Sequence, residues 1–224
     1  QNDMIHAISH ELRTPIARFG FGLALLRGAR TGEERQRHAD ALARDVAELD
    51  QLVAELLSYG ALDQPGRAPE RSLVHLGELI DSVVGGLALE MELLDAQCAV
   101  RLDLPSPQVI CDPRLTARAL INLVKNAMRY GHGHIVIAAD LVGAALRIRV
   151  DDNGLGIAPD DRKAIFEPFH RLDRSRDRDT GGVGLGLAIA LRAVRAQGGE
   201  LQAGDSPLGG ARFELVLPSA MSGS

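Results

Sequence analysis

The chain has 224 residues, of which 46% are hydrophobic, and carries a formal charge of -5 at pH 7. This length allows one or two ordinary cores, and no stretch of about 18 residues is free of charge, so no membrane span is expected. The negative balance and the dispersed Lys and Arg residues argue against nucleic acid as a direct ligand. Two cysteines, Cys98 and Cys111, fit a reducing compartment better as buried thiols than as a disulfide.

Two amphipathic helices are predicted at the start of the chain. Apolar residues recur at steps of three and four from Ile5 to Leu26 and again from Ala39 to Leu56, which is the stripe of a bundle helix. The stretch RGARTGEER between them supplies glycines and Thr31 as a candidate N-cap. One hairpin cannot cover both stripes from water, so we expect two copies to form a four-helix bundle in a homodimer. Because the first stripe is already under way at Met4, we expect a fragment whose membrane or targeting segments lie upstream.

The second half of the chain has mixed periodicity and follows a linker that contains Pro and Gly. The expected strands and helices are a strand and helix within 72–94, strands at 98–104 and 108–112, a helix at 113–131, a β-hairpin at 134–152, a helix at about 183–197, and strands at 199–205 and 211–218. This order predicts an α/β domain with helices on one face of a sheet. We therefore divide the chain into a helical domain at 1–62, a linker at 63–72, a second domain at 73–219 and a tail at 220–224.

On the first predicted helix, His10, Glu11 and Thr14 interrupt the apolar repeat just before Pro15. At about 100° per residue, His10 points roughly 160° away from the apolar stripe, and Thr14 lies within about 40° of His10 on the same outer face. Glu11 projects beside the histidine. Pro15 removes the N–H that would bond to the Glu11 carbonyl, so a bend is expected one turn after His10.

Three interpretations of this cluster compete: a zinc site, a solvated helix face and a reactive histidine. A zinc site on one helix needs a second histidine four residues after the first, where this chain has Thr14. Taken alone, the stretch fits an ordinary solvated face. The reactive histidine needs support from elsewhere in the chain.

The block NLVKNAMRYG has the composition of a site for phosphates and a metal ion. Asn122 and Asn126 share one helix face, with Lys125 and Arg129 beside them and Tyr130 at the end. An amide oxygen suits Mg²⁺, and the cations suit phosphates. A surface-polar helix with a capping Tyr-Gly pair explains the block equally well.

The block VDDNGLGI ends an apolar strand with an acidic pair. Gly154 and Gly156 allow a backbone turn close to a ligand. A carboxylate at the floor of an apolar pocket, such as that of Asp152, can accept a hydrogen bond from the exocyclic amine of adenine. A plain Asp-Gly turn is the alternative.

In TGGVGLGLAIA, three alternating glycines, Gly182, Gly184 and Gly186, lead into a helix whose first N–H groups attract phosphate. Their spacing matches neither the Rossmann fingerprint nor the P-loop. The long stretch at 159–182 that precedes them is rich in Arg and Asp and suits a lid over a polyphosphate. Phe166 and Phe169 would pin the base of this lid.

Five blocks, SHELRTP, NLVKNAMRYG, DDNGLGI, FEPFHRLD and GVGLGLAIA, resemble in this order the H, N, G1, F and G2 boxes of bacterial two-component sensor histidine kinases. The resemblance extends over residues 4–218 and is greatest to the EnvZ and RstB type, whose partners are response regulators of the OmpR class. It implies an α helical-hairpin dimerisation domain followed by an α/β sandwich ATP-binding domain of the type shared with gyrase, Hsp90 and MutL.

The resemblance also implies roles for individual residues, with ATP and Mg²⁺ as cofactors. His10 would accept the γ-phosphoryl group on Nε2, Glu11 would be its base, and Thr14 would position water for dephosphorylation of the partner aspartate. Asn126 would coordinate Mg²⁺, and Asp152 would bind the adenine amine. The other implied nucleotide-binding positions are Asn122, Lys125, Arg129, Tyr130, Gly154, Gly156, Ile157, Gly182, Gly184, Leu185, Gly186 and Leu187.

By the same resemblance, the chain would be the cytoplasmic fragment of a bacterial inner-membrane sensor, reaching the membrane only through upstream segments. It would pass its phosphoryl group to an aspartate of a response regulator receiver domain and also dephosphorylate that partner. Two rival hypotheses are a stand-alone ATPase or chaperone of the same nucleotide fold, and a dimerisation scaffold that binds ATP only as a regulatory ligand.

Overall fold

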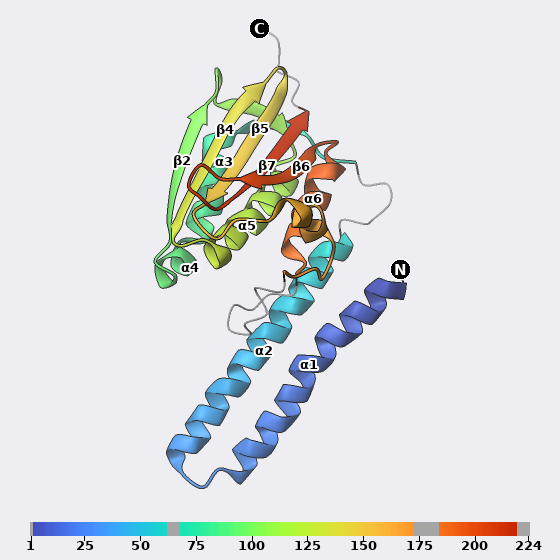
Figure 1. Cartoon of the computed structure of the whole chain (residues 1–224), viewed down its shortest axis with the longest axis vertical. Coiled ribbons are helices and arrows are strands. Elements are labelled where there is room, and N and C mark those ends of the chain that lie inside the picture. The colour runs from blue at the N-terminus through green and yellow to red at the C-terminus, as the bar shows by residue number, and fades with distance from the viewer. Residues whose placement is uncertain (1, 62–67, 173–183, 219–224) are drawn as a thin grey trace.

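The computed structural model describes residues 2–61, 68–172 and 184–218. Residues 2–61 form a helical hairpin, and an α/β domain follows it (Figure 1). The expected fold class, a helical hairpin followed by an α/β ATPase-type domain, is confirmed. Within the described ranges, no helix is both long and apolar enough to span a bilayer. Only the end of the predicted linker is described, so the domain boundaries stay predictions.

The hairpin consists of α1 (Asn2–Gly28) and α2 (Gly32–Ala61), and α1 continues through Pro15. Thr31 begins α2 with a capping box: its Oγ1 accepts from the Glu34 N–H at 3.1 Å, and Glu34 Oε2 accepts from the Thr31 N–H at 3.2 Å. The predicted N-cap is therefore confirmed. This reciprocal pair satisfies N–H groups that the first helical turn cannot use itself.

Contacts between the helices fix their register. Arg18 pairs with Asp45 at 3.4 Å and with Glu48, and a Cβ on Gly22 would lie 2.9 Å from Leu42 Cδ2. Continuing this antiparallel register, the turn of α1 that contains His10 lies level with about residue 54 of α2.

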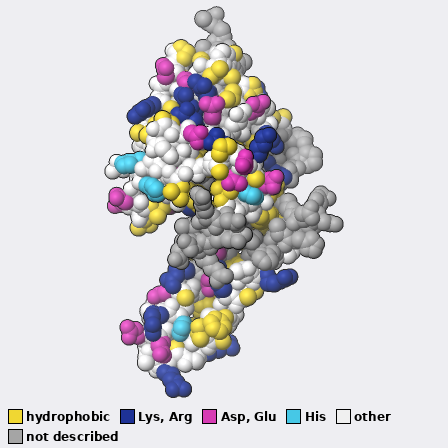
Figure 2. Space-filling view, in the orientation of Figure 1, with side chains coloured by type: hydrophobic (Ala, Val, Ile, Leu, Met, Phe, Trp, Pro, Cys, Tyr) yellow, Lys and Arg dark blue, Asp and Glu magenta, His cyan; other side chains and the backbone are white. Residues whose placement is uncertain are grey.

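Much of the predicted apolar stripe reaches solvent in a single chain. Ile16 is 58% exposed and Val46 is 51% exposed, and Phe19 and Val53 are also exposed. Hydrophobic side chains are accordingly visible on the surface of the hairpin (Figure 2). The hairpin alone therefore leaves part of its bundle face in water.

The α/β domain is built on a five-stranded sheet with strand order β2-β4-β5-β7-β6, in which only the β2–β4 pair is parallel. Its strands are β2 (Gln97–Asp103), β4 (His134–Val142), β5 (Ala145–Asp152), β6 (Glu200–Asp205) and β7 (Ala211–Pro218). A two-stranded sheet pairs β1 (Ser72–His75) with β3 (Gln108–Cys111). The helical elements are α3 (Leu76–Gly86), α4 (Ala88–Leu93), α5 (Pro113–Tyr130), α6 (Gly186–Ala196) and the short 3₁₀ turns η1 (Pro159–Asp161) and η2 (Ala164–Phe166).

The main core lies between this sheet and the helices on one of its faces (Figure 1). Burial alternates along β4, β5 and β7, because successive side chains of a strand point to opposite faces. Ile148, Leu120 and Phe213 are fully buried, and each such side chain contributes about 1.5–3 kcal/mol. Both cysteines are free thiols; Cys111 is buried as expected, whereas Cys98 on the edge strand is only half-buried.

A second, smaller apolar cluster joins the hairpin to the α/β domain. Leu52 and Tyr59 of α2 are 2% and 3% exposed, and they pack with Leu185, Ala188 and Ile189 around the start of α6. We call this contact between α2 and α6 the interdomain seam.

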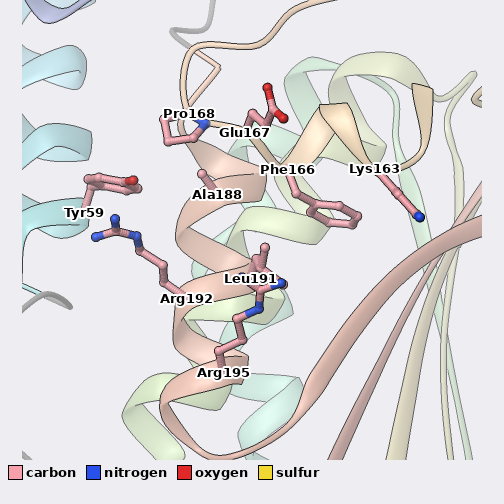
Figure 3. Close-up of a pocket in the computed structure, with 9 residues that line it drawn as sticks. All are labelled: Tyr59, Lys163, Phe166, Glu167, Pro168, Ala188, Leu191, Arg192 and Arg195. Atoms are coloured by element: carbon pink, nitrogen blue, oxygen red, sulfur yellow. The ribbon is translucent and has the colours of Figure 1, made fainter. Parts of the chain in front are cut away.

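The seam includes a cation-aromatic contact and borders a pocket. The guanidinium carbon of Arg192 lies 3.6 Å from the centroid of the Tyr59 ring. In Figure 3, Arg192 extends from α6 toward Tyr59 on the hairpin. Beside this pair, an open pocket of about 340 Å³ lies between α6, Tyr59 and the Lys163–Pro168 segment. The seam is thus a small, specific contact at the side of an open pocket.

Candidate functional site

The most completely formed part of the site is the carboxylate of Asp152 at the end of β5. Strand alternation places it on the same face as Ile148 and Val150, which the helices cover, and it is 2% exposed. Its Oδ1 accepts hydrogen bonds from the backbone N–H groups of Gly154 at 2.9 Å and Ala211 at 3.0 Å. Among the described residues Oδ2 has no hydrogen-bond partner, so this oxygen is available for a ligand donor.

Burial raises the pKa of the Asp152 carboxyl, and the neighbouring charge of Asp151 acts in the same direction. The two backbone donors and His132 lower the pKa, but less than burial raises it. Asp151 itself points to the other face and forms a two-bond pair with Arg212, at 2.7 and 2.9 Å. The two adjacent acids therefore have different surroundings, and only Asp152 faces the covered side of the sheet.

Close backbone approaches surround the Asp152 carboxylate. A Cβ on Gly154 would lie 2.1 Å from the Tyr130 carbonyl oxygen, and a Cβ on Gly210 would lie 2.2 Å from Asp152 Oδ1. Gly156, at φ +70°, turns the chain toward Gly210. Sequence reasoning missed Gly210, because the pair of glycines before β7 has no evident role until the β5–β7 pairing places it beside Asp152.

Asn153 was also missed and connects the strand end to the end of α5. Its Oδ1 accepts from the backbone N–H groups of His132 at 2.9 Å and His134 at 3.1 Å, and its Nδ2 lies 3.3 Å from the His132 carbonyl. These bonds hold the turn after α5 against the residues that follow Asp152. Tyr130, predicted to contact adenine, is consequently kept next to Gly154.

Helix α5 carries the residues predicted to bind phosphates and Mg²⁺. Asn122 is half-buried and donates to the Arg118 carbonyl at 2.8 Å, and Asn126 is half-buried one turn later. Lys125 instead lies 3.0 Å from Glu90 of α4, with both side chains exposed. The structure thus brings the two asparagines together and directs Lys125 toward α4, while its predicted contact with phosphates stays a prediction.

The cations at the end of α5 also face the hairpin. Burial raises the pKa of Glu55 on α2, and a hydrogen bond from Gln51 and the positive charges of Arg129 and Lys125 act against that increase. A carboxylate of the hairpin therefore lies within electrostatic reach of the predicted phosphate-binding side chains.

The glycine-rich block lies where α6 begins. Gly184 has φ +78°, and its carbonyl accepts from the Phe169 N–H at 3.0 Å. A Cβ on Gly186 would lie 3.1 Å from Asn122 Oδ1, so α6 starts in contact with α5. Leu185 is fully buried in the seam, whereas Leu187 and Ile157 pack at the edge of the main core.

The first part of the predicted lid, residues 159–172, is described, and it includes η1 and η2. Phe166 packs edge-on against Phe213, with 6.3 Å between ring centroids, and Phe169 packs at the seam. Gly182 and the rest of the predicted lid from residue 173 onward lie outside the described residues.

In the hairpin, the backbone at His10 and Glu11 is helical, but their side chains lie outside the described set, and Thr14 is exposed. The phospho-acceptor role of this cluster stays a prediction.

Two family models match the chain. Residues 1–65 match the His Kinase A (phospho-acceptor) domain, and residues 111–221 match the histidine kinase-, DNA gyrase B- and HSP90-like ATPase family. Sensor histidine kinase CpxA of Escherichia coli K12 is 37% identical over 219 residues, which are 97% of this chain and 47% of CpxA. Sensor protein RstB of the same organism is 38% identical over 225 residues, covering 97% of this chain and 49% of RstB. The chain spans about half the length of the curated relatives it matches.

Solved structures agree with these matches. The Acinetobacter baumannii histidine kinase AdeS has a TM-score of 0.72 at 27% identity, covering 93% of this chain and 97% of AdeS. Full-length ShkA in complex with AMPPNP has a TM-score of 0.71 at 26% identity, covering 99% of this chain and 47% of ShkA.

The first prediction concerns Gly210. Gly210→Ala would place a Cβ 2.2 Å from Asp152 Oδ1 and 2.3 Å from the Gly154 nitrogen, so the pocket must distort. We expect a loss of about 1–3 kcal/mol in the free energy of unfolding, and loss of the thermal stabilisation by Mg-ADP. The control is Gly204→Ala on β6, where a Cβ meets nothing within 4 Å. An alanine at 210 with the full Mg-ADP effect contradicts the proposed pocket.

The second prediction concerns the charge on Asp152. Because its pKa is raised in the folded state, its contribution to stability is complete below the ordinary pKa of Asp and is lost as the pH rises through the raised pKa. Asparagine does not titrate, so the Asp152→Asn variant does not lose this contribution as the pH rises. The free energy of unfolding of the variant minus that of the parent should therefore increase from about pH 4 to pH 7. Mg-ADP binding should weaken about 10- to 100-fold, because one amide oxygen must serve two backbone donors and the ligand amine.

Urea unfolding across this pH range and calorimetric titration with Mg-ADP measure the two effects. The assignment fails if the variant binds Mg-ADP as the parent does, or if the stability difference decreases with pH.

Proposed function

This chain belongs to the sensor histidine kinase family, and we propose that it is the catalytic core of an ATP-dependent protein-histidine kinase that phosphorylates its own His10. The main support is the Asp152 carboxylate, which is buried at the end of β5 on the helix-covered face of the sheet. Its Oδ1 accepts two backbone hydrogen bonds, and its Oδ2 accepts none from the described residues. The interdomain seam also holds this domain against the part of α2 that lies level with the His10 turn of α1. The phospho-acceptor match at residues 1–65 favours a kinase over a stand-alone ATPase or an ATP-binding scaffold.

In the proposed complex, adenine donates its exocyclic amine to Asp152 Oδ2, and Tyr130 contacts the base. The phosphates lie toward the start of α6, where backbone N–H groups and the helix dipole favour anions. Asn126 would hold Mg²⁺ through its amide oxygen, with Asn122 nearby and Arg129 near the phosphates. An amide oxygen is a ligand of the kind Mg²⁺ prefers, and the ion would neutralise phosphate charge during transfer.

Phosphoryl transfer depends mainly on position and charge neutralisation. Nε2 of neutral His10 forms the bond to the γ-phosphorus, the bond from that phosphorus to the bridging oxygen breaks, and ADP leaves. Glu11 orients the imidazole and takes the proton from its other nitrogen. The predicted lid and linker would let the nucleotide domain approach His10 and withdraw.

We further infer a homodimer and a response regulator partner. The exposed stripe residues, including Ile16 and Val46, need a second hairpin to cover them. His10 and Thr14 would face outward from that bundle, where an OmpR-class receiver domain could dock. The whole protein would be an inner-membrane sensor, of which this chain is the cytoplasmic part.

The third prediction tests the kinase function. Incubation with γ-labelled ATP and Mg²⁺ should place acid-labile phosphate on His10, and His10→Gln should abolish the label while Mg-ADP still binds. His38→Gln on α2 is the matched control and should label like the parent. Equal labelling of the His10→Gln chain would refute the assignment.

The fourth prediction concerns phosphatase activity. Thr14→Ala should label itself normally but remove phosphate from a phosphorylated receiver domain at least about tenfold more slowly, since one positioned hydrogen bond to water is lost. Release of inorganic phosphate from the isolated phospho-receiver measures this step. An unchanged rate with Thr14→Ala leaves Thr14 without the proposed role.

A further inference from the structure

A buried polar network joins the ends of α5 and α6 that lie away from the predicted phosphate site. Gln197, which is 2% exposed, caps the end of α6, while Asp112 and Thr116, 0% and 1% exposed, stand at the start of α5. None of these residues belongs to the sequence blocks that pointed to nucleotide binding. Buried polar side chains in a small domain are retained only when their hydrogen bonds are satisfied.

The side chain of Gln197 uses both of its polar atoms within this network. Its Oε1 accepts from the Asp112 N–H at 2.9 Å, and its Nε2 lies 3.3 Å from both Thr116 Oγ1 and the Ala193 carbonyl. A shift of α6 along α5 would break these bonds and leave buried groups unpaired, at a cost of about 1–3 kcal/mol for each group. The network therefore favours one position of α6 on α5.

The segment where the chain enters the α/β domain is bonded to the same network. Asp112 Oδ2 accepts from the Glu70 N–H at 2.8 Å, and Arg71 Nη2 donates to the Gln197 carbonyl. Burial raises the pKa of Asp112, but backbone donors, including Glu70, and the charge of Arg114 outweigh it and lower the pKa. The carboxylate is therefore an ionised acceptor. Displacement of Glu70 and Arg71 would act on the ends of both helices at once.

The other ends of these helices form the predicted phosphate side of the site. There, α6 begins so close to α5 that a Cβ on Gly186 would lie 3.1 Å from Asn122 Oδ1. Gln197 is about 16 Å away along the axis of α6. Because α6 is a continuous helix, a rotation at Gln197 changes its separation from Asn122 and Asn126 at the opposite end.

We propose that Gln197 is a positioning residue for the nucleotide. With Asp112 and Thr116 it sets how α6 lies on α5, and through Arg71 it links that arrangement to the entrance of the domain. The proposal rests on the proposed function for the identity of the ligand, but it concerns nucleotide binding and not phosphoryl transfer.

Gln197→Met tests the proposal, because methionine keeps the length of the side chain but leaves the buried Asp112 N–H without an acceptor. We expect the full chain to bind Mg-ADP about five- to twentyfold more weakly in calorimetric titration, at a temperature well below unfolding. Transfer from already phosphorylated His10 to a receiver domain should be unchanged, since that step uses no nucleotide. The matched control is Gln202→Met at an exposed position of β6, which should bind Mg-ADP like the parent.

Two further variants keep the test decisive if Gln197→Met folds poorly. Thr116→Val removes one hydroxyl at nearly constant volume and should weaken Mg-ADP binding in the same direction by a smaller factor. Arg71→Ala should weaken it about twofold, the effect of one partly exposed hydrogen bond; unchanged affinity would refute the link to the domain entrance.

The proposal is overturned if the folded Gln197→Met chain melts earlier yet binds Mg-ADP as tightly as the parent, since the network would then be structural only. Failure of the kinase function gives a different result: His10 would remain unlabelled in the parent chain, whatever its affinity for Mg-ADP.

Discussion

The pocket depends on one carboxylate oxygen that accepts two backbone hydrogen bonds. Oδ1 of Asp152 binds the N–H groups of Gly154 and Ala211, so it joins the turn after β5 to the start of β7. The surrounding surface is mostly backbone, since neither Gly154 nor Gly210 has room for a Cβ. Burial raises the pKa of this carboxyl group, so keeping it charged in the free protein costs stability. A buried acid with a shifted pKa and one oxygen left for a ligand donor is typical of a binding site.

The seam has the properties expected of a contact that must open. It is small: Leu52 and Tyr59 are almost fully buried, and an open pocket of about 340 Å³ lies beside Tyr59. Its most specific contact, Arg192 over Tyr59, contributes roughly 0.5–2 kcal/mol by the usual strength of cation-aromatic pairs. Such a contact can orient the nucleotide domain without holding it permanently. Glu55 lies near Arg129, and the phosphates of ATP would compete with its carboxyl group for that cation, which disfavours the docked arrangement once ATP is bound.

Local sequence patterns predicted the secondary structure well. They could not predict contacts between residues that are far apart in the chain. The alternation from His134 to Asp152 was sufficient for the β4–β5 hairpin, and the helix expected at 113–131 is found as α5, whose first turn Asp112 caps. Gly210 and Gln197 gain their roles only from neighbours far along the chain, Asp152 and Asp112. Lys125 illustrates the same limit: helix geometry placed it beside the asparagines, but its actual partner, Glu90, depends on how α4 packs.

Helix α2 serves two contacts that lie mostly on different faces and meet at Leu56. Its bundle stripe, which includes Val46 and Val53, is exposed in the single chain and is free to meet a second copy. Leu52 and Tyr59 lie roughly 100° around the helix from that stripe. Leu56 of the α2 stripe and Leu12 of the α1 stripe also pack against the seam cluster. Opening the seam would therefore expose a short apolar segment that adjoins the bundle face. By the register of the hairpin this segment lies level with His10, so the same opening would also clear the approach to the predicted phospho-acceptor for a visiting receiver domain.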